Sequence, residues 1–220
     1  MQKKINLFFI SLIFMSFFLT AEISNKVSSP IPNQDSDKWL LAHIDVETTG
    51  LIPGYHEMID IGIVMTDLSG NIIDSLFLHI QAKHPERLSK GAFKVNQYNN
   101  KKWEAMGAVS SKVAVEKIYA FIKKTRGDKK AMMIAHNAHF DSAFIDHMLR
   151  SEGKSWEDLF YYYILDIPSM AWGLGVTHNQ IMAYYNIKNE PAVHAGISGA
   201  MLNVRVYKGI LKYRKEMNKK

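Results

Sequence analysis

The sequence contains no cysteine. This absence excludes zinc sites built from cysteine, cysteine nucleophiles and disulfide scaffolds. It fits an envelope protein that avoids stray disulfides, and it fits a cytosolic protein equally well. Internal repeats are also missing, and 220 residues with 47% hydrophobic and 22% charged composition are expected to form one globular domain.

The first 21 residues differ in composition from the rest. Lys3 and Lys4 precede an almost unbroken apolar run over residues 5–21. A positive start followed by an apolar segment is typical of a secretory signal, and the run is also near the short limit, about 17 residues, for spanning a bilayer. We therefore expect residues 1–21 to be a signal peptide or an N-terminal membrane anchor. The protein would then be exported, either periplasmic or secreted, or tethered to the membrane through residues 5–21.

The remaining chain divides into three parts. Residues 22–38 are rich in Ser, Asn, Pro and Asp without an apolar period, which predicts a linker. Residues 39–213 would form the folded domain, and residues 214–220 a basic tail. The formal net charge is +6, and removal of the two N-terminal lysines would lower it by two, to +4. A basic surface around an acidic site would suit a polyanionic substrate, although many proteins without such a partner are also basic.

Hydrophobic periodicity predicts a meander of strands followed by alternating helices and strands. The predicted strands are 39–46, 58–65, 72–80, 131–135 and 161–165, with a hairpin turn at 69–71, and the predicted helices are 111–124, 142–149, 167–172, 178–185 and 195–212. This order implies an α/β domain in which a mixed five-stranded sheet is flanked by helices on both sides.

Two carboxylates stand at the end of the first predicted strand, in the stretch His43-Ile44-Asp45-Val46-Glu47-Thr48-Thr49-Gly50-Leu51. Residues two apart point to the same face of a strand, so Asp45 and Glu47 would project side by side. In partial burial they would repel each other, and a divalent cation with a preference for oxygen, such as Mg²⁺ or Mn²⁺, would relieve this repulsion. The alternative is an edge strand with both acids in water.

Two further polar motifs follow strands or open helices. Asn137 and Asp141 lie in the turn after strand 131–135, where Asp141 would serve either as a helix cap or as a carboxylate delivered to the same edge as Asp45. His194 opens the last predicted helix. A lone histidine is more often structural, but near a metal centre it would serve as a general base.

Together these motifs resemble those of the DEDDh (DnaQ-like) 3′–5′ exonucleases, the superfamily of polymerase proofreading subunits, and within it the ribonuclease T type. The resemblance covers about residues 39–212. It rests on the stretch 45–51, on Ala135-His136-Asn137-Ala138-His139-Phe140-Asp141-Ser142-Ala143-Phe144, on His194, and on Leu165-Asp166-Ile167-Pro168-Ser169-Met170-Ala171. The order and spacing are specific, and the resemblance implies a ribonuclease H-like fold.

The resemblance also implies roles for individual residues. Asp45, Glu47 and Asp141 would hold two divalent cations, Mg²⁺ or Mn²⁺, and His194 would deprotonate the attacking water. The two cations would clamp the attacking and leaving oxygens and release a nucleoside 5′-monophosphate from a single-stranded DNA or RNA 3′ end. The residues expected to bind the terminal nucleotide are Thr48, Thr49, Gly50, Leu51, Asn137 and Phe140. Asp166 would be a supporting or structural residue. Some relatives dimerise, but no sequence feature commits this chain to a homodimer.

The chain departs from the family at Gly199. The family places its fourth acidic ligand five residues after the histidine, and glycine has no side chain there. Ser198, Glu190 and Asn203 are poor replacements by sequence position. Three explanations stay open: a binding module without efficient chemistry, slow cleavage with water or substrate phosphate replacing the ligand, or an altered position in an active sequence.

Three hypotheses follow. The first is a metal-dependent 3′–5′ exonuclease, which the retained acids and His194 favour. The second is a catalytically weak or inactive module that binds nucleic-acid 3′ ends, which Gly199 favours. The third is a secreted metal-binding protein without a nucleic-acid role, which leaves the stretch 48–51 unexplained.

Overall fold

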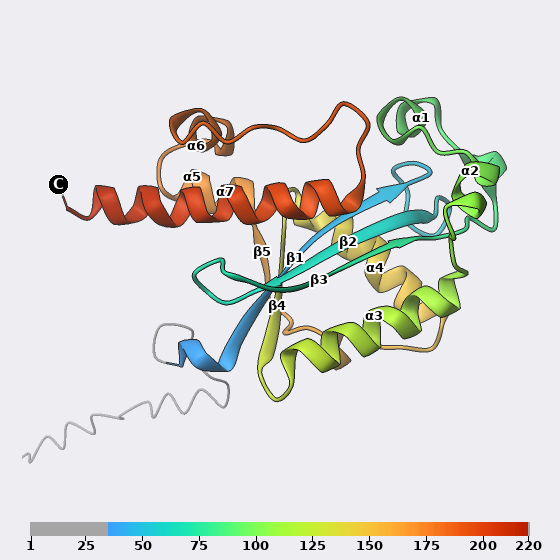
Figure 1. The fold of residues 1–220 in the computed structure, drawn as a ribbon, viewed down its shortest axis with the longest axis horizontal. Helices are drawn as coiled ribbons and strands as arrows, with labels where there is room; N and C mark the ends of the chain where they lie inside the picture. Colours follow the sequence, from blue (N-terminus) through green and yellow to red (C-terminus); the bar gives the residue numbers. More distant parts are fainter. Residues whose placement is uncertain (1–34, 220) are drawn as a thin grey trace, which may run out of the picture.

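The centre of the fold is a five-stranded sheet, which the computed structural model describes within residues 35–219 (Figure 1). Its strands lie in the order β3-β2-β1-β4-β5. β1 pairs antiparallel with β2 and parallel with β4; β3 joins β2 antiparallel, and β5 joins β4 parallel. The strands are β1 (Trp39–Thr48), β2 (Met58–Thr66), β3 (Ile72–His79), β4 (Lys130–Ala135) and β5 (Ile164–Asp166). The predicted mixed five-stranded sheet is confirmed, and β1 is its middle strand.

Helices cover both faces of this sheet. α3 and α4 lie on one face, and the long α7 runs across the other with α5 and α6 beside it (Figure 1). The helices are α1 (Lys90–Asn96), α2 (Asn100–Ala105), α3 (Ser111–Arg126), α4 (Ala138–Ser151), α5 (Ile167–Gly173), α6 (His178–Tyr184) and α7 (Gly196–Met217), with 3-10 turns at Ser36–Lys38, Pro85–Arg87 and Trp156–Asp158.

The middle strand is buried on both sides because its side chains alternate between the two faces. Ala42, Ile44 and Val46 join the apolar cluster under α3 and α4. Trp39 and Leu41 join the cluster under α5, α6 and α7. The odd-numbered positions of β1 therefore face α7, and any polar side chain among them is held between the sheet and that helix.

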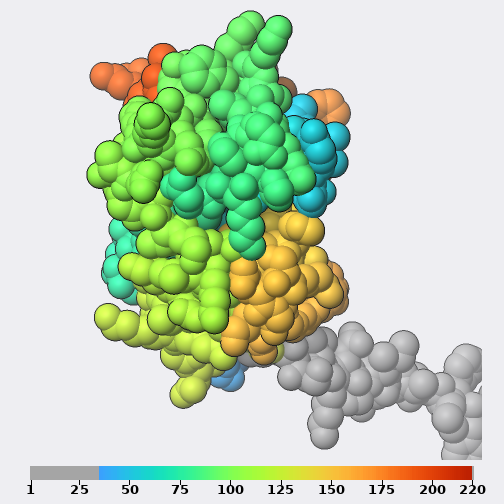
Figure 2. Space-filling view, turned by 90° about the vertical axis from the view of Figure 1, so that its right-hand side faces the viewer, coloured from blue at the N-terminus to red at the C-terminus, as the bar shows by residue number. Residues whose placement is uncertain are grey.

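The sequence does not predict α1 and α2, because six or seven residues show no clear helical period. Their N-termini are capped by the side chains of Ser89 and Asn99. Trp103 of α2 is buried, and its Nε1 donates a hydrogen bond to the carbonyl oxygen of Ile59 at 2.8 Å. Figure 2 shows this green segment at one end of the molecule, above α3 and α4.

The fifth strand is shorter and later than the predicted strand 161–165. The backbone nitrogen of Tyr161 still donates to the carbonyl oxygen of Ala131. Its ring packs edge-on against the ring of Trp39, with 5.0 Å between centroids. The apolar character of this stretch therefore reflects ring packing at the sheet margin, and regular pairing begins only at Ile164.

Helices α4 and α7 extend furthest beyond their predicted bounds. α4 begins at Ala138, four residues before the predicted start, so that Asp141 lies inside its first turn. α7 ends at Met217 and thus includes the first residues of the predicted basic tail. The predicted signal or anchor over residues 1–21, and the predicted linker up to residue 34, lie outside the described residues. Within residues 35–219, no helix is both long enough and apolar enough to cross a bilayer.

Candidate active site

Two acids from β1 lie under the N-terminal end of α7. Asp45 pairs with Gly62 of β2, and Glu47 pairs with Asp60. Asp45 is partly buried and Glu47 is 7% exposed. The alternative of an edge strand with both acids in water is therefore wrong, because β1 is the middle strand and α7 covers this face.

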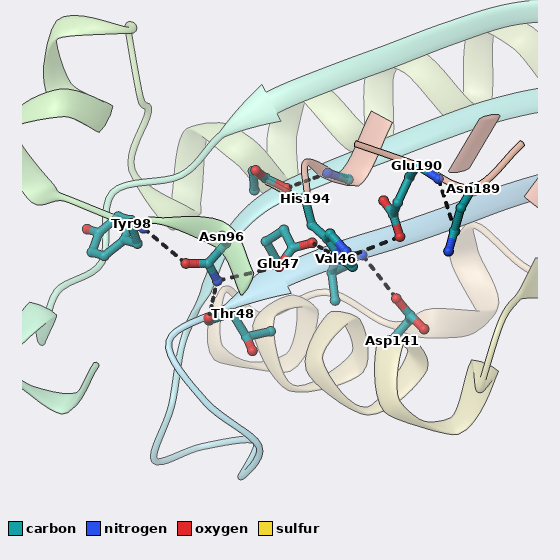
Figure 3. A network of polar contacts seen from close by, with 11 residues as sticks. Val46, Glu47, Thr48, Asn96, Tyr98, Asp141, Asn189, Glu190 and His194 are labelled. Atoms are coloured by element: carbon teal, nitrogen blue, oxygen red, sulfur yellow. Dashed lines mark hydrogen bonds and ion pairs between the residues drawn. The ribbon is translucent and has the colours of Figure 1, made fainter. Parts of the chain in front are cut away.

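Asp141 reaches the same place from α4. Its Oδ1 accepts a hydrogen bond from the backbone nitrogen of Val46 at 3.0 Å, which ties the first turn of α4 to β1 (Figure 3). The carboxylate is therefore tied to the strand, and the cap residue of α4 is Asn137, in a left-handed conformation with φ 62°. Asparagine tolerates that conformation better than most residues.

Burial and mutual repulsion disfavour the charged forms of these acids. Burial raises the pKa of Glu47 to about 8, and the charge of Asp60 adds to the effect. Burial likewise raises the pKa of Asp141 to about 7. The pKa of Asp45 lies well above its ordinary value through burial and the charges of Asp141 and Glu47. Within the described residues, His194 is the one basic side chain that forms an ion pair with any of these three acids, so a divalent cation would stabilise their charged forms.

His194 lies between two of the acids in the loop before α7. Its Nδ1 is 3.9 Å from Oε1 of Glu47 and 3.4 Å from Oε1 of Glu190 (Figure 3). Its backbone nitrogen donates to the carbonyl oxygen of Val95, so the loop is held against α1. Its side chain is 38% exposed, which leaves the imidazole accessible from the cavity that Asp45, Glu190, His194 and Gly199 line.

Gly199 faces Asp45 directly. A Cβ atom added at Gly199 would lie 2.4 Å from both the carboxyl carbon and Oδ2 of Asp45. The Asp45 carboxylate thus occupies the space that any side chain at position 199 would need. The close approach of α7 to the sheet makes this contact possible, since a Cβ at Gly62 would lie 2.3 Å from the backbone of Gly196.

The residues after Glu47 form an ordered turn at the edge of the site. The Thr48 hydroxyl donates to the carbonyl oxygen of Gly50 at 2.6 Å, and the Thr49 hydroxyl accepts from the backbone nitrogen of Glu57. Leu51 projects outward and is 78% exposed. The structure thus places a buried polar turn next to one exposed apolar side chain.

The two predicted substrate residues of the second motif lie on the α4 side. Asn137 is exposed, and Phe140 is partly buried with its ring 4.9 Å from that of Phe144. Asp166 stands behind them: its Oδ1 accepts from the backbone nitrogen of Ala138, and its Oδ2 accepts from that of Ser169. Asp166 therefore joins the starts of α4 and α5 and has a structural position, as the sequence suggests.

Two residues with a place in this site are missed by the sequence analysis. Asn96 of α1 donates to Oε2 of Glu47 at 3.4 Å and to the carbonyl oxygen of Thr48 at 2.9 Å. Asp60 is 1% exposed, and its Oδ1 accepts from the backbone nitrogen of Gly196 at the start of α7. A carboxylate within the apolar strand 58–65 was the available signal for Asp60, whereas nothing in the sequence distinguishes Asn96.

Glu190 lies closer to Asp45 and Gly199 in space than its place in the sequence indicates. Sequence position alone makes it a poor replacement for the fourth acid because it precedes α7. In the structure its side chain lines the same cavity as Asp45 and Gly199. Its Oε2 is buried and has no hydrogen-bond partner among the described residues.

The residues fit a divalent cation by their chemistry, although they are not drawn together around one. Between residues 35 and 219, no three His, Asp or Glu side chains already converge closely enough to hold an ion. The donors are nevertheless carboxylate oxygens, which Mg²⁺ and Mn²⁺ prefer. Their raised pKa values and the unpartnered oxygen of Glu190 indicate a site that a cation would stabilise.

Comparison with known proteins agrees with this geometry. A family model described as "Exonuclease" (RNase_T) matches residues 43–207. Ribonuclease T of Vibrio campbellii is 29% identical over 110 residues, covering 47% of this chain and 51% of that protein, and ribonuclease T of Haemophilus ducreyi is 24% identical over 135 residues, covering 58% and 63%. The chain thus spans about half to three fifths of these relatives.

Solved structures show the same fold. E. coli Exonuclease I in complex with a dT13 oligonucleotide superposes with a TM-score of 0.66 at 11% identity, covering 82% of this chain and 42% of that one. Exonuclease I from Methylocaldum szegediense gives 0.64 at 14% identity, covering 81% and 41%. The model match over residues 43–207 includes every acid of the site together with His194. The chain therefore belongs to the exonuclease family, as a DEDDh (DnaQ-like) member with a ribonuclease H-like fold.

Proposed function

We propose that this protein is a metal-dependent 3′–5′ exonuclease that releases nucleoside 5′-monophosphates from single-stranded nucleic-acid 3′ ends. One observation carries the proposal: three carboxylates from β1 and α4 lie close enough for their charges to interact and have raised pKa values, beside a histidine that lines an open cavity. A purely structural role would not require three acids in the middle of a sheet, where burial and mutual repulsion destabilise their charged forms.

Asp45, Glu47 and Asp141 would hold the divalent cations. Bound cations supply Lewis-acid stabilisation of the charge that develops at phosphorus and favour ionisation of the attacking water. The hydrogen bond from the Val46 nitrogen fixes one oxygen of Asp141, and Asn96 fixes one oxygen of Glu47. A backbone donor thus orients Asp141 and a side-chain amide orients Glu47 before a cation binds, while Oε1 of Glu47 lies 3.9 Å from Nδ1 of His194.

His194 would act as the general base. Its Nδ1 faces the carboxylates of Glu47 and Glu190, which favours the tautomer with the proton on Nδ1. Nε2 is then the nitrogen that accepts the proton from the attacking water. The hydrogen bond from the His194 backbone to Val95 keeps the ring at the mouth of the cavity.

The terminal nucleotide would bind at the turn after Glu47. Leu51 offers an exposed apolar surface for a base, and the turn behind it is tied to α1 because the Ser89 nitrogen donates to the carbonyl oxygen of Thr49. Phe93 and Val95 on α1 are also exposed, at 45% and 39%. Exonuclease I, which has a similar fold, has been solved with oligonucleotides, and the net charge of +6 here suits a polyanion.

The test is a 5′-labelled single-stranded oligonucleotide incubated with the purified protein and Mn²⁺. We expect products shortened one nucleotide at a time from the 3′ end, none with EDTA, and none from an oligonucleotide whose 3′ end is blocked. Binding without shortening would instead favour the module that only binds 3′ ends. Internal cuts, shortening from the 5′ end, or neither binding nor shortening would contradict both.

The N-terminal segment supports a second, separate proposal, that the protein acts outside the cytoplasm. A basic start and the apolar run over residues 5–21 have the layout of a secretory signal or anchor. Fractionation of cells that express the full chain with a C-terminal tag checks this proposal. We expect the protein in the periplasm, medium or membrane, and deletion of residues 1–21 should return it to the cytoplasm.

A further inference from the structure

We propose that Glu190, in the loop between α6 and α7, is a ligand of the metal centre and takes the place of the fourth acid that Gly199 cannot provide. The inference rests on the proposed function, since it concerns the same metal centre. It assigns a role to a residue outside the motifs that define the family.

The first observation is the position of Glu190. Its side chain is 14% exposed and lines the cavity that Asp45, His194 and Gly199 also line. Figure 3 shows Glu190 and His194 pointing toward each other above β1. An acid that precedes α7 in the sequence is therefore next to the first turn of that helix in space, where the missing ligand belongs.

The second observation is that the two carboxylate oxygens of Glu190 are unequal. Oε1 is 3.4 Å from Nδ1 of His194. Oε2 is buried and has no hydrogen-bond partner within residues 35–219. A buried carboxylate oxygen without a partner is costly, and a cation bound at this oxygen would satisfy it. If Glu190 served only to orient His194, its second oxygen would be expected to face solvent or a donor.

The third observation is electrostatic. Glu190 is partly buried, and its charge interacts with those of His194 and Arg205. The negative charge of Glu190 also acts on the carboxylates of Asp45 and Glu47 on β1. The loop acid therefore belongs to the same group of repelling charges as the strand acids, and a cation shared among them would relieve the repulsion.

The fourth observation explains why the fourth acid would come from the loop. A Cβ at Gly199 would lie 2.4 Å from the carboxylate of Asp45, so no side chain fits on α7 while Asp45 keeps its position. The loop is held against α1 on the C-terminal side of Glu190, where the His194 nitrogen donates to the carbonyl oxygen of Val95. Next to Glu190 itself, the Asn189 side chain accepts from the Glu190 nitrogen at 3.0 Å and orders the backbone locally. The glycine on α7 and the acid in the loop are thus complementary features of one site.

Equilibrium binding of Mn²⁺, followed by the electron paramagnetic resonance signal of the free ion, tests this assignment without any need for catalysis. Four proteins are compared: the unmodified chain, Glu190→Gln, Gly199→Asp and the double variant. Glu116→Gln is the matched control, because Glu116 is an exposed acid on α3, across the sheet. Circular dichroism and thermal melting verify that each protein is folded.

We expect Glu190→Gln to weaken Mn²⁺ binding about 10-fold or more in the unmodified chain, the scale of a disturbed metal ligand. In the Gly199→Asp background, where α7 supplies an acid, Glu190→Gln should weaken Mn²⁺ binding by less than about 3-fold. Such non-additivity would show that the two acids serve the same function. Glu116→Gln should change nothing.

Two results would overturn the assignment. One is an unchanged Mn²⁺ affinity in a folded Glu190→Gln protein. If only the pH profile of cleavage shifts in that protein, Glu190 acts through His194 alone and is not a ligand. The other is an equal loss in both backgrounds. Failure of the proposed function is distinguishable from both, because Mn²⁺ binding that depends on Glu190 would then occur without any shortening of oligonucleotides.

Discussion

The two sides of the candidate metal centre are built differently. On the sheet side, Asp45 and Glu47 come from β1, and Asp141 is tied to β1 through the Val46 nitrogen. On the helix side, His194 and Glu190 come from a loop that one backbone hydrogen bond holds against α1. The sheet side carries the acids that the family resemblance leads us to expect, whereas position 199 on the helix side, where the same resemblance leads us to expect an acid, is a glycine.

This difference teaches where such a centre can change. A one-residue shift in β1 would turn every side chain to the other face, so the sheet acids cannot be supplied from elsewhere without a change in the fold. A loop has no such constraint. An acid missing from the first turns of α7 can be supplied by a residue several positions upstream, because the loop returns to the same cavity.

The largest effect is expected on the sheet side. Asp45→Asn keeps the shape of the side chain but removes a charged ligand, and we expect 3′-end shortening to fall about 100-fold or more, because both metal binding and the position of the attacking water are lost. Initial rates on a labelled oligonucleotide measure this. Asp74→Asn, on an exposed part of β3, is the matched control and should be unaffected. Comparable rates for the two variants would show that Asp45 takes no part in cleavage.

The next effect concerns Gly199. Gly199→Asp places an acid where the family resemblance leads us to expect one and displaces the Asp45 carboxylate. We expect cleavage to rise about 10-fold, the scale of a regained positioning contact. Gly199→Ala introduces the same Cβ without a carboxylate, so cleavage should fall below that of the unmodified protein. Rates that rise equally in both variants would show that helix propensity matters at this position and that the acid does not.

A smaller effect is expected in the dependence of stability on pH. Burial raises the pKa of Glu47 from 4.5 to about 8 and that of Asp141 from 3.8 to about 7. The folded state therefore holds these protons after the unfolded state has released them, and stability should fall as the pH rises from about 4 to about 8. Melting of the metal-free protein should follow this trend.

Mg²⁺ should restore the stability that the metal-free protein loses at high pH, because the cation stabilises the charged carboxylates. We expect Mg²⁺ to raise the melting temperature by several degrees at pH 8 and by much less at pH 5. Glu47→Gln should make the melting temperature of the metal-free protein depend less on pH, whereas Asp74→Asn should leave this pH dependence unchanged. A melting temperature that rises steadily from pH 5 to pH 8 without metal would contradict the assigned pKa shifts.

The smallest effect tests how α7 is held over the sheet. Asp60→Ala removes the acceptor for the Gly196 nitrogen, and we expect a loss of about 1–2 kcal/mol in the free energy of unfolding, typical of a lost cap with a buried donor left unpaired. Asp60→Asn keeps an acceptor and should cost less. Urea unfolding measures both, and an Ala variant as stable as the Asn variant would show that this hydrogen bond does not hold the helix.

Much of the sheet side could be predicted from the sequence. Period-two alternation and the apolar lead-in identify β1, and the motif spacing identifies the family, so that Asp45, Glu47 and Asp141 follow. The five-stranded sheet follows from the meander and the alternation after it. These features depend on local pattern and on strand geometry, which the sequence displays directly.

The helix side could not be predicted to the same depth. The position of Glu190 depends on where the loop before α7 contacts α1, a tertiary contact between His194 and Val95 without a sequence signal. The contact between Gly199 and Asp45 depends on how closely α7 approaches the sheet. α1 and α2 were missed because they are short, and Asn96 of α1, which contacts Glu47, was missed with them.

The most direct test of the account is an anomalous difference map from crystals of the protein grown with Mn²⁺. We predict a peak whose ligands include carboxylate oxygens of Asp45 and Glu190, with no protein ligand from position 199. A peak bound by the sheet acids while Glu190 stays turned toward His194, or no peak at these residues at saturating Mn²⁺, would contradict it.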